Sequence, residues 1–375
     1  MSFENISLMI IAGGKSSRLG RDKRFIKVGG VGLLEKILSK AKAFNFAEKF
    51  LCVEENLPAL KILADKFGAK LLIDKIKNSG PMSGLAVGLA NIKTDWALVI
   101  STDMPFFEFE TLRPLMKKFS FARAIIPVVG GRRQMLAAFY RRELAEIFSQ
   151  ELSRGQLKLF AAIKKVPHEL MELADEENFF NVNTRADLRL ASGRAENISR
   201  TTPIISIVAP ASGTGKTTFI ERLIKIFSAQ KISVGVIKSD AHGFDLDVEG
   251  KDSCRFQTAG AKSVAVVAPR GWFMIHNAPE DFFSVAQKMS GVDLILTESR
   301  TKNFFPTISL WRGRGEIIAD EKVAAIFSSA PAASDEIYHF DPDDLAAAES
   351  LCKFLAGFTQ CCKFPARSSR TESRA

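Results

Sequence analysis

Apolar positions along this chain follow two alternating patterns. Short apolar runs of strand length, among them Ile6–Ile11 and Trp96–Ser101, are separated by stretches such as residues 33–41, where apolar residues recur every three or four positions. The alternation continues in the second half, with an apolar run at 204–209 and helical spacing at 217–227. Strands that alternate with helices are typical of layered α/β domains. The chain is therefore predicted to be α/β throughout.

The same patterns place the remaining elements and the domain boundaries. Further strands are expected at 50–53, 71–73, 124–127, 137–140, 232–237, 264–268, 292–297, 307–311 and 323–327, and further helices at 82–92 and 343–358. A small, polar, proline-terminated stretch near 191–203 is typical of a linker. We therefore predict two doubly wound three-layer domains at 1–192 and 203–358, a linker at 193–202 and a disordered basic tail at 359–375.

Composition narrows the class of protein. With 375 residues, 46% of them hydrophobic and 25% charged, the chain has the size and balance of two soluble globular domains. No apolar stretch approaches the roughly 20 residues that span a bilayer, and the first residues lack the pattern of a signal peptide, so we expect a cytoplasmic protein without membrane partners. The net charge of +10 is spread without a dense basic block, which favours polyphosphate ligands over nucleic acid. The five cysteines include no CxxC pair, so free thiols are expected rather than a zinc site.

The first strand leads directly into a glycine-rich, basic segment. Gly13 and Gly14 allow the backbone to approach a nucleotide without a Cβ in the way, and Gly20 permits a turn with positive φ. Four cations of the segment are equipped to hold a triphosphate and to stabilise charge on a leaving pyrophosphate: Lys15, Arg18, Arg21 and Lys23. We expect Lys23 to bind the triphosphate, with Arg18 as the second catalytic cation.

Asp103 is the strongest carboxylate candidate. It follows the run Trp96–Ser101 and so falls at the carboxyl end of a strand, where open α/β sheets collect ligands. A carboxylate there is a suitable catalytic Mg²⁺ ligand next to the α-phosphate that is attacked. The alternative is a turn-forming or helix-capping residue before Met104-Pro105. Because the chain also carries the first phosphate-binding loop, the role of Asp103 as a Mg²⁺ ligand is favoured over this alternative.

A second phosphate-binding loop follows the run at 204–209. The sequence Pro210-Ala-Ser-Gly-Thr-Gly-Lys-Thr217 matches the Walker A pattern GxxxxGK[ST], except that proline replaces the first glycine. Lys216 is expected to reach the β- and γ-phosphates and Thr217 to bind Mg²⁺. Pro210 fixes φ at about −65°, which is expected to alter the entry to the loop. The predicted P-loop binding residues are Ser212, Gly213, Thr214, Gly215, Lys216, Thr217 and Thr218.

The string AGGxSxRLGxDK resembles the signature of the molybdenum cofactor guanylyltransferases (MobA). Later landmarks extend the resemblance over about residues 5–190: Asp74, Gly80-Pro-Met-Ser-Gly84, Ser101-Thr-Asp-Met-Pro105 and Asn181-Val-Asn-Thr184. The resemblance implies a Rossmann-like nucleotidyltransferase that joins GMP from Mg-GTP to the terminal phosphate of molybdopterin and releases pyrophosphate. It also implies that GTP contacts Ile11, Ala12, Gly13, Gly14, Lys23, Asp74 and Asp103.

Several residues of the first half keep alternative interpretations. Asp74 is equally typical of a turn at a strand end. Asn183 either completes a polar pocket or belongs to a helix start, since Thr184 and Asp187 have capping-box spacing. Glu54 stands where the family often has an asparagine that recognises the base, so selectivity for guanine stays open.

Residues 203–330 resemble the MobB family, the GTP-binding partner of the guanylyltransferase, with a P-loop NTPase-like fold. Besides the loop, the resemblance rests on His242 with Asp245 and Asp247, Gly250-Lys-Asp-Ser-Cys-Arg255, Ala259-Gly-Ala261 and Asp293-Leu-Ile-Leu-Thr-Glu-Ser299. Glu298 ends a buried-type strand, as a Walker B-like acid does, and is a further candidate Mg²⁺ ligand. The group of His242, Asp245 and Asp247 is more typical of a solvated loop than of a metal cluster.

Together the two halves predict a bifunctional, Mg²⁺-dependent molybdenum cofactor biosynthesis protein. The implied partners are GTP and molybdopterin or Mo-molybdopterin, with molybdenum-insertion proteins and acceptor molybdoenzymes as further candidates. One alternative is a related transferase that uses CTP or a sugar phosphate. Another is a P-loop GTPase or scaffold with an inactive transferase half. The MobB-like half favours guanylyl transfer among these.

Overall fold

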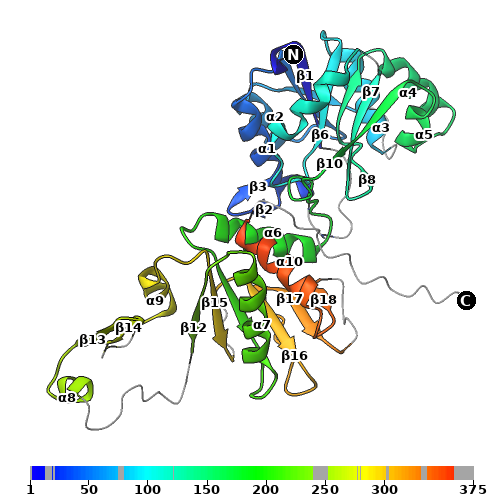
Figure 1. The fold of residues 1–375 in the computed structure, drawn as a ribbon. Coiled ribbons are helices and arrows are strands. Elements are labelled where there is room, and N and C mark those ends of the chain that lie inside the picture. Colours follow the sequence, from blue (N-terminus) through cyan, green and yellow to red (C-terminus); the bar gives the residue numbers. More distant parts are fainter. Residues whose placement is uncertain are drawn as a thin grey trace, which may run out of the picture.

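The protein contains two separate, mainly parallel sheets (Figure 1). This computed structural model describes residues 2–12, 19, 22–74, 80–120, 122–239, 252–276, 278, 280–300, 304–330 and 336–358. A strand forms at each of the expected apolar runs, and helices follow most of them, so the predicted α/β class with two doubly wound domains is confirmed. Strands at 27–28, 31–32, 132–133, 168–173, 271–276 and 338–340 were not predicted. The tail at 359–375 lies outside the described residues.

The first sheet has the strand order β5-β4-β1-β6-β9-β7-β10, with β8 paired to β7. Its strands are β1 (Ile6–Ile11), β4 (Glu48–Val53), β5 (Lys70–Ile73), β6 (Trp96–Ser101), β7 (Ala124–Val129), β8 (Arg132–Arg133), β9 (Ala137–Arg141) and β10 (His168–Leu173). The strands β5, β4, β1 and β6 form parallel ladders, whereas β9 is antiparallel to both β6 and β7. The chain thus leaves β1 toward β4 on one side and returns to β6 on the other, as in Rossmann-like folds.

Helices cover both faces of the first sheet because its strands are apolar on both sides. Along β1, Leu8 and Ile10 pack into one hydrophobic cluster, whereas Met9 and Ile11 pack into another. The first cluster includes α1 (Leu33–Lys42), α2 (Pro58–Lys66) and the 3₁₀ segment η3 (Phe109–Lys118); the second includes α3 (Pro81–Asn91), α4 (Leu144–Ser153) and α5 (Leu159–Ile163). Burial of both faces is typical of doubly wound sheets.

Short elements after β1 complete the first half. They are the 3₁₀ turns η1 (Phe3–Asn5) and η2 (Lys23–Phe25) and the small hairpin of β2 (Lys27–Val28) and β3 (Val31–Gly32). In η2, the Asp22 side chain accepts a hydrogen bond from the Arg24 backbone N–H and so caps the turn. This cap fixes the start of the turn that carries Lys23.

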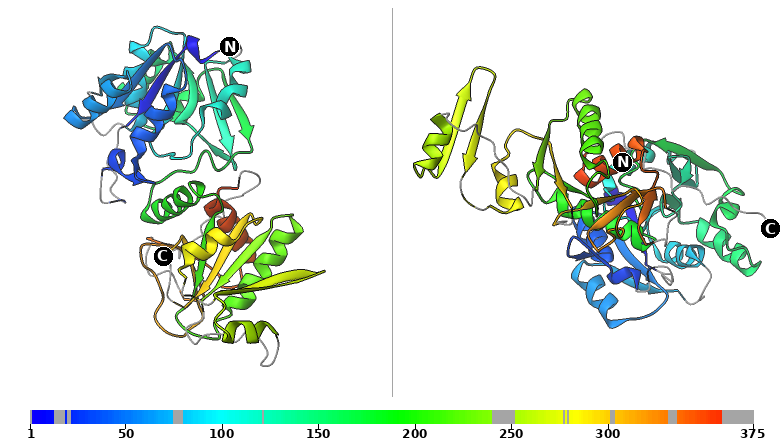
Figure 2. Two further views of the ribbon diagram at one scale, coloured as in Figure 1. Left: turned by 90° about the vertical axis from the view of Figure 1, so that its left-hand side faces the viewer. Right: turned by 90° about the horizontal axis from the view of Figure 1, so that it is seen from below.

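The second sheet is parallel, with the order β12-β15-β11-β16-β17-β18. Its strands are β11 (Ile204–Val208), β12 (Val234–Lys238), β15 (Leu294–Ser299), β16 (Thr307–Trp311), β17 (Val323–Ser328) and β18 (Tyr338–Phe340). One face packs against α7 (Lys216–Ala229) and α10 (Leu345–Ala356), and the other against α9 (Phe282–Lys288). A hairpin of β13 (Ser263–Ala268) and β14 (Gly271–His276), with α8 (Asp252–Thr258), projects away from this sheet (Figure 2).

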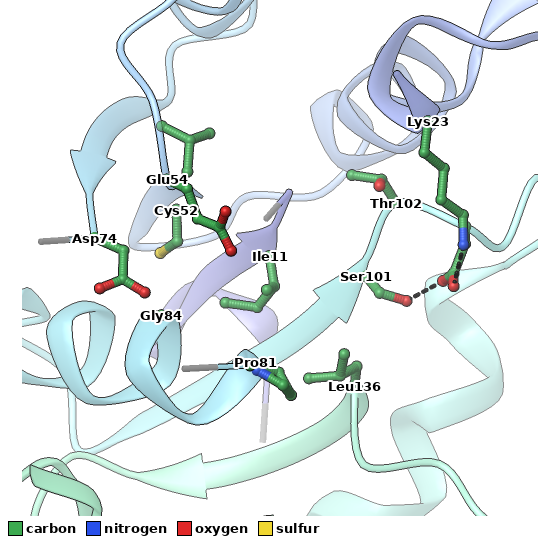
Figure 3. Close-up of a pocket in the computed structure, with 13 residues that line it drawn as sticks. Ile11, Lys23, Cys52, Glu54, Asp74, Pro81, Gly84, Ser101, Thr102 and Leu136 are labelled. Atoms are coloured by element: carbon green, nitrogen blue, oxygen red, sulfur yellow. Dashed lines mark hydrogen bonds and ion pairs between the residues drawn. The ribbon is translucent and has the colours of Figure 1, made fainter. Parts of the chain in front are cut away.

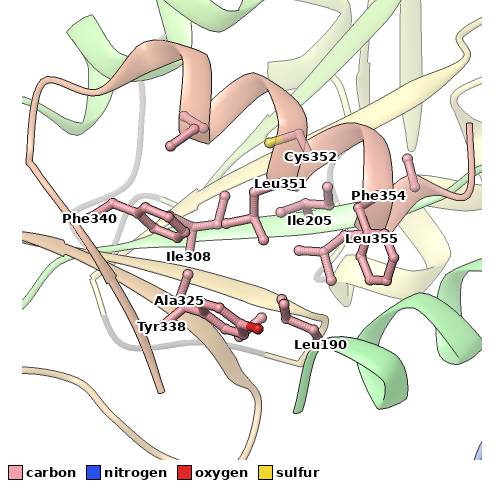
Figure 4. Close-up of a cluster of buried hydrophobic side chains, with 14 of the residues drawn as sticks. Leu190, Ile205, Ile308, Ala325, Tyr338, Phe340, Leu351, Cys352, Phe354 and Leu355 are labelled. Carbon is pink, nitrogen blue, oxygen red and sulfur yellow. The ribbon is translucent and has the colours of Figure 1, made fainter. Parts of the chain in front are cut away.

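Helix α6 (Arg185–Ile198) lies between the two sheets, beside α10 (Figure 1). The linker expected at 193–202 is therefore wrong for residues 193–198, which form the last part of this helix. The small residues that suggested a linker allow close packing instead: a Cβ added at Gly193 would lie 3.1 Å from both Leu355 and Pro306. Figure 4 shows Leu190 of α6 in the same apolar cluster as side chains of α10 and the second sheet.

Among the described residues, every helix is too short or too polar to cross a lipid bilayer. Three described cysteines, Cys52, Cys254 and Cys352, carry free thiols.

Candidate functional site

A pocket opens where the first sheet's parallel strands end. Its cavity volume is about 180 Å³. Its walls include the last residues of β1, β4 and β6, which are Ile11, Val53 and Ser101 (Figure 3). The order of these strands makes this edge a topological switch point, the position at which open α/β sheets bind ligands.

Four of the residues predicted from the first loop and its downstream landmarks line this pocket: Ile11, Lys23, Asp74 and Asp103. Ala12 is buried beside them, with its backbone N–H donating to the Cys52 carbonyl at 2.9 Å. Gly13, Gly14 and Arg18 lie outside the described residues, as do Lys15, Gly20 and Arg21.

Lys23 forms the polar centre of the pocket. Its Nζ donates to Asp103 Oδ2 at 2.8 Å and to Asn183 Oδ1 at 2.7 Å. Asp103 also accepts a hydrogen bond from the Ser101 hydroxyl, drawn in Figure 3. Side chains from three distant parts of the sequence therefore meet around one ammonium group, although Lys23 and Asp103 are only partly shielded from solvent.

The helix-start interpretation of Asn183 is confirmed, and its side chain also contacts Lys23. Thr184 is the N-cap of α6, and it forms a capping box with Asp187 as the pattern predicted. The Asn183 side chain accepts a hydrogen bond from Lys23, which lines the pocket, but Asn183 is not itself a lining residue. Asp103 likewise lies in a turn after β6 and points its carboxylate into the pocket, but it caps no described helix.

The wall opposite Lys23 carries Asp74, Cys52 and Glu54 (Figure 3). Asp74 is buried and accepts a hydrogen bond from the Ser83 hydroxyl at 2.5 Å. Burial, and secondly the neighbouring Asp74 carboxylate, raise the pKa of the Cys52 thiol to about 12. Cys52 therefore stays protonated near neutral pH and is not an activated nucleophile.

Oxygen donors of this pocket fit a hard divalent cation. Mg²⁺ in phosphoryl-transfer sites is held by one or two carboxylates and completes its shell with water and substrate phosphates. Asp103 supplies such a carboxylate, with the Ser101 hydroxyl beside it. Among the described residues no group of three or more His, Cys, Asp or Glu side chains converges, so a cage made entirely of protein ligands is absent from this part of the chain.

Sequence reasoning missed two hydroxyls that bond to carboxylates of this pocket. Ser101 lies in a recognised motif but was assigned no contact, and it bonds to Asp103. Ser83, within Gly80-Pro-Met-Ser-Gly84, orients Asp74. Their motifs contained the signal, but only the fold shows which carboxylate each hydroxyl reaches.

The second loop lies at the carboxyl end of β11, which is central in the second sheet. Gly213 and Gly215 both have positive φ, at 72° and 81°, which explains why glycine occupies these positions. Lys216 is largely buried over the loop, and its Nζ donates to the Ala211 carbonyl at 3.3 Å. Burial lowers the pKa of Lys216, an effect that Glu298 opposes and Arg300 reinforces.

The two candidate metal ligands of this loop lie together. The Thr217 hydroxyl donates to Glu298 Oε1 at 3.1 Å. Adjacent ligand oxygens around an octahedral Mg²⁺ are separated by about 3 Å, since each Mg–O distance is about 2.1 Å. The donor set therefore fits that ion. The group of His242, Asp245 and Asp247 lies outside the described residues.

Pro210 packs at the entry to this loop. A Cβ added at Gly315, in the segment after β16, would lie 3.0 Å from the Pro210 Cβ. The proline ring therefore fills space against a glycine that also needs its positive φ of 72°. The strand, loop and helix of a P-loop are nevertheless all present.

Comparison with known proteins matches each half of the chain to a different family model. Residues 8–168 match the MobA-like NTP transferase domain. The chain is also 31% identical, over 188 residues, to a "Probable molybdenum cofactor guanylyltransferase" of Clostridium perfringens, covering 48% of this chain and 91% of that protein. The chain belongs to the molybdenum cofactor guanylyltransferase family.

A second relative of this guanylyltransferase-family protein carries the same name. It comes from Pyrococcus horikoshii and is 30% identical over 192 residues, which are 48% of this chain and 96% of the relative. Residues 204–329 match the family model for molybdopterin guanine dinucleotide synthesis protein B. Among solved structures, molybdopterin-guanine dinucleotide biosynthesis protein A from Archaeoglobus fulgidus matches 50% of this chain and 97% of its own, with 23% identity and a TM-score of 0.44.

Membership of this family identifies the first domain as a nucleotidyltransferase. The match over residues 204–329 identifies a MobB domain, so the protein is a fusion of the two. The predicted resemblance is confirmed for both halves.

Proposed function

We propose that this protein transfers GMP from GTP to the terminal phosphate of molybdopterin, and that the reaction takes place in the pocket at the end of the first sheet. The observation that carries the proposal is the convergence of Lys23, Asp103 and Asn183 at this edge, in a chain of the guanylyltransferase family. The second domain is proposed to bind GTP as an adaptor.

The reaction needs no nucleophile from the protein. A terminal phosphate oxygen of molybdopterin attacks the α-phosphorus of GTP, the bond to the β-phosphate oxygen breaks, and pyrophosphate leaves. Because two anions must approach each other, catalysis depends on positioning and on charge neutralisation. The Cys52 thiol stays protonated and is not expected to take part in the reaction.

Lys23 and Asp103 are proposed to exchange partners when substrate enters. In the protein alone each neutralises the other at 2.8 Å. With a triphosphate in the pocket, the Lys23 ammonium would bind phosphate oxygens, and the Asp103 carboxylate would be the group that holds Mg²⁺. Mg²⁺ bound there would neutralise charge on the α-phosphate. The ion pair holds both side chains next to each other at the pocket until substrate binds.

Substitutions in the two domains test this assignment. Asp103→Ala removes the proposed metal ligand and Lys23's carboxylate partner, so synthesis of the guanine dinucleotide is expected to fall at least about a hundredfold. Lys216→Ala removes the P-loop cation in the other domain, so most of the synthesis with purified substrates is expected to remain. Both variants would be assayed for dinucleotide by chromatography, after circular dichroism has shown that they are folded.

The opposite pattern would overturn the assignment of the transfer reaction to the first domain. Loss of synthesis in Lys216→Ala, with activity retained in Asp103→Ala, places the essential chemistry in the second domain. A P-loop enzyme with an inactive first half predicts that result.

A further inference from the structure

A hydroxyl of the second domain reaches α6, the helix that begins just after Asn183. Tyr338 lies on β18, at the edge of the second sheet, and its hydroxyl donates to Asp187 Oδ1 at 2.5 Å. Tyr338 is 7% exposed and Asp187 is 4% exposed. Figure 4 shows the ring beside Leu190, one turn further along α6.

Asp187 uses its other oxygen to hold the segment that precedes α6. Its Oδ2 accepts the backbone N–H of Asn183 at 2.9 Å and that of Thr184 at 2.8 Å. The Thr184 hydroxyl accepts the Asp187 N–H in return, which closes the capping box. A second backbone bond, from the Val182 N–H to the Asp103 carbonyl at 2.8 Å, ties the same segment to the catalytic strand end.

The held segment presents Asn183 to Lys23, which lines the pocket. Asn183 Oδ1 accepts from Lys23 Nζ at 2.7 Å, next to the 2.8 Å contact between Lys23 and Asp103. An unbroken series of hydrogen bonds thus connects β18 of the second domain to the ammonium group of the first. The two ends of its interdomain bond are 151 residues apart in sequence.

We infer that Tyr338 is a positioning residue for guanylyl transfer: through Asp187 it fixes Asn183, and through Asn183 it fixes Lys23 beside Asp103. The inference rests on the proposed function of the first pocket. It assigns the second domain a direct part in the transfer reaction, independent of any nucleotide on the P-loop. The position of Lys23 matters because electrostatic catalysis depends on preset geometry.

The full-length Tyr338→Phe variant removes the hydroxyl and keeps the buried ring. A hydrogen bond to an ionised group corresponds to roughly a ten- to hundredfold change in an equilibrium. Only part of this free-energy change is transmitted through Asp187 to the pocket. We therefore expect kcat for dinucleotide synthesis to fall about three- to tenfold. The matched control is Lys322→Gln, which removes the interdomain Lys322–Glu196 ion pair of 2.8 Å, further along α6, and should leave kcat within about twofold of the wild type.

A double-mutant cycle separates positioning from a general structural effect. If Tyr338 acts through Asn183, then Tyr338→Phe slows the wild-type protein but causes no further loss in an Asn183→Ala background. An equal loss in both backgrounds, or no loss in either, would overturn the inference.

Hydrogen exchange provides a readout that needs no activity. The amides of Asn183 and Thr184 donate to Asp187, so Tyr338→Phe should speed their exchange, whereas Lys322→Gln should not. Unchanged exchange at these amides in Tyr338→Phe contradicts the inference even if the protein is active. A wild-type protein that makes no dinucleotide would instead refute the proposed function, while the exchange comparison still tests the contact.

Discussion

Lys23 has two oxygen acceptors within 2.8 Å, and each belongs to a different structural unit. Asp103 follows β6 in the centre of the first sheet, whereas Asn183 precedes α6. The ammonium group is therefore positioned from two directions before substrate arrives. Preorganisation of this kind reduces the reorganisation needed when charge develops on the leaving pyrophosphate.

We propose that Glu54, which lines the pocket, recognises the nucleotide base. Its carboxylate accepts hydrogen bonds, and the N1–H and 2-amino groups of guanine present two adjacent donors. Cytosine presents one donor next to an acceptor, and a carboxylate cannot pair with both. A site built on such a pair rejects analogues that lack one partner.

Glu54→Ala is therefore expected to reduce kcat/KM for GTP about ten- to hundredfold and to abolish the preference for GTP over ITP, which lacks the 2-amino group. The measurement is dinucleotide formation from each nucleotide in separate reactions. Glu55→Ala, at the exposed neighbouring position, is the control and should retain the wild-type preference. A Glu54→Ala variant with unchanged preference means that another group recognises the base.

At the scale of elements, α6 connects the pocket of the first domain to the core of the second. Its N-terminal capping box fixes Asn183, its apolar face joins the core of the second domain, and its polar side chains bond to α10. Arg194 is an example of these polar contacts, because it donates to the Phe354 carbonyl at 2.6 Å and pairs with Glu177 at 2.6 Å. The guanidinium also lies against the rings of Phe106 and Phe354, so the contact combines packing with charge.

Close packing of this helix makes a prediction about Gly193. Gly193→Val places new atoms where even a Cβ would lie 3.1 Å from Leu355 and Pro306, so the variant should lower the free energy of unfolding by about 1–3 kcal/mol. The control is Ser192→Val, which adds the same β-branched side chain on the exposed side of the helix and should change stability by at most about 0.5 kcal/mol. Urea denaturation followed by tryptophan fluorescence measures the free energy of unfolding of both variants. Equal stability of the two would mean that the interface accommodates the larger side chain at position 193 without loss of stability.

At the scale of the whole molecule, one apolar cluster joins the two halves. It contains Ile26, Val182 and Leu190 from the first half together with strands and helices of the second. Ion pairs between Arg185 and Glu336 and between Glu196 and Lys322 surround it. Domains that share a substantial apolar interface move little relative to each other, unlike domains on a flexible linker.

The sequence predicts the central strands well and the connections poorly, for a physical reason. Strands such as β1 and β6 are buried on both faces and appear as continuous apolar runs with sharp ends. The edge strand β10 is only partly buried and has no such run. Helix α6 resembles a linker because the small residues that permit close helix packing are also those found in linkers.

The candidate site, too, is predicted in part by the sequence. Its residue types could be chosen from the first loop and from the motif around Asp103, because each follows a strand. Their mutual contacts could not be derived from spacing, since Lys23 is separated from Asp103 by 80 positions and from Asn183 by 160. The part played by Tyr338 left no local pattern at all, because it arises only where the two domains meet.

The most direct test of the proposed reaction is the product formed by the wild-type protein when molybdopterin, Mg²⁺ and equal concentrations of GTP and CTP are supplied together. Chromatography with mass detection identifies the dinucleotide, and a coupled assay quantifies pyrophosphate. We predict molybdopterin guanine dinucleotide and one pyrophosphate per dinucleotide. Formation of the cytosine dinucleotide alone, or release of inorganic phosphate from GTP without any dinucleotide, would contradict the proposed guanylyl transfer.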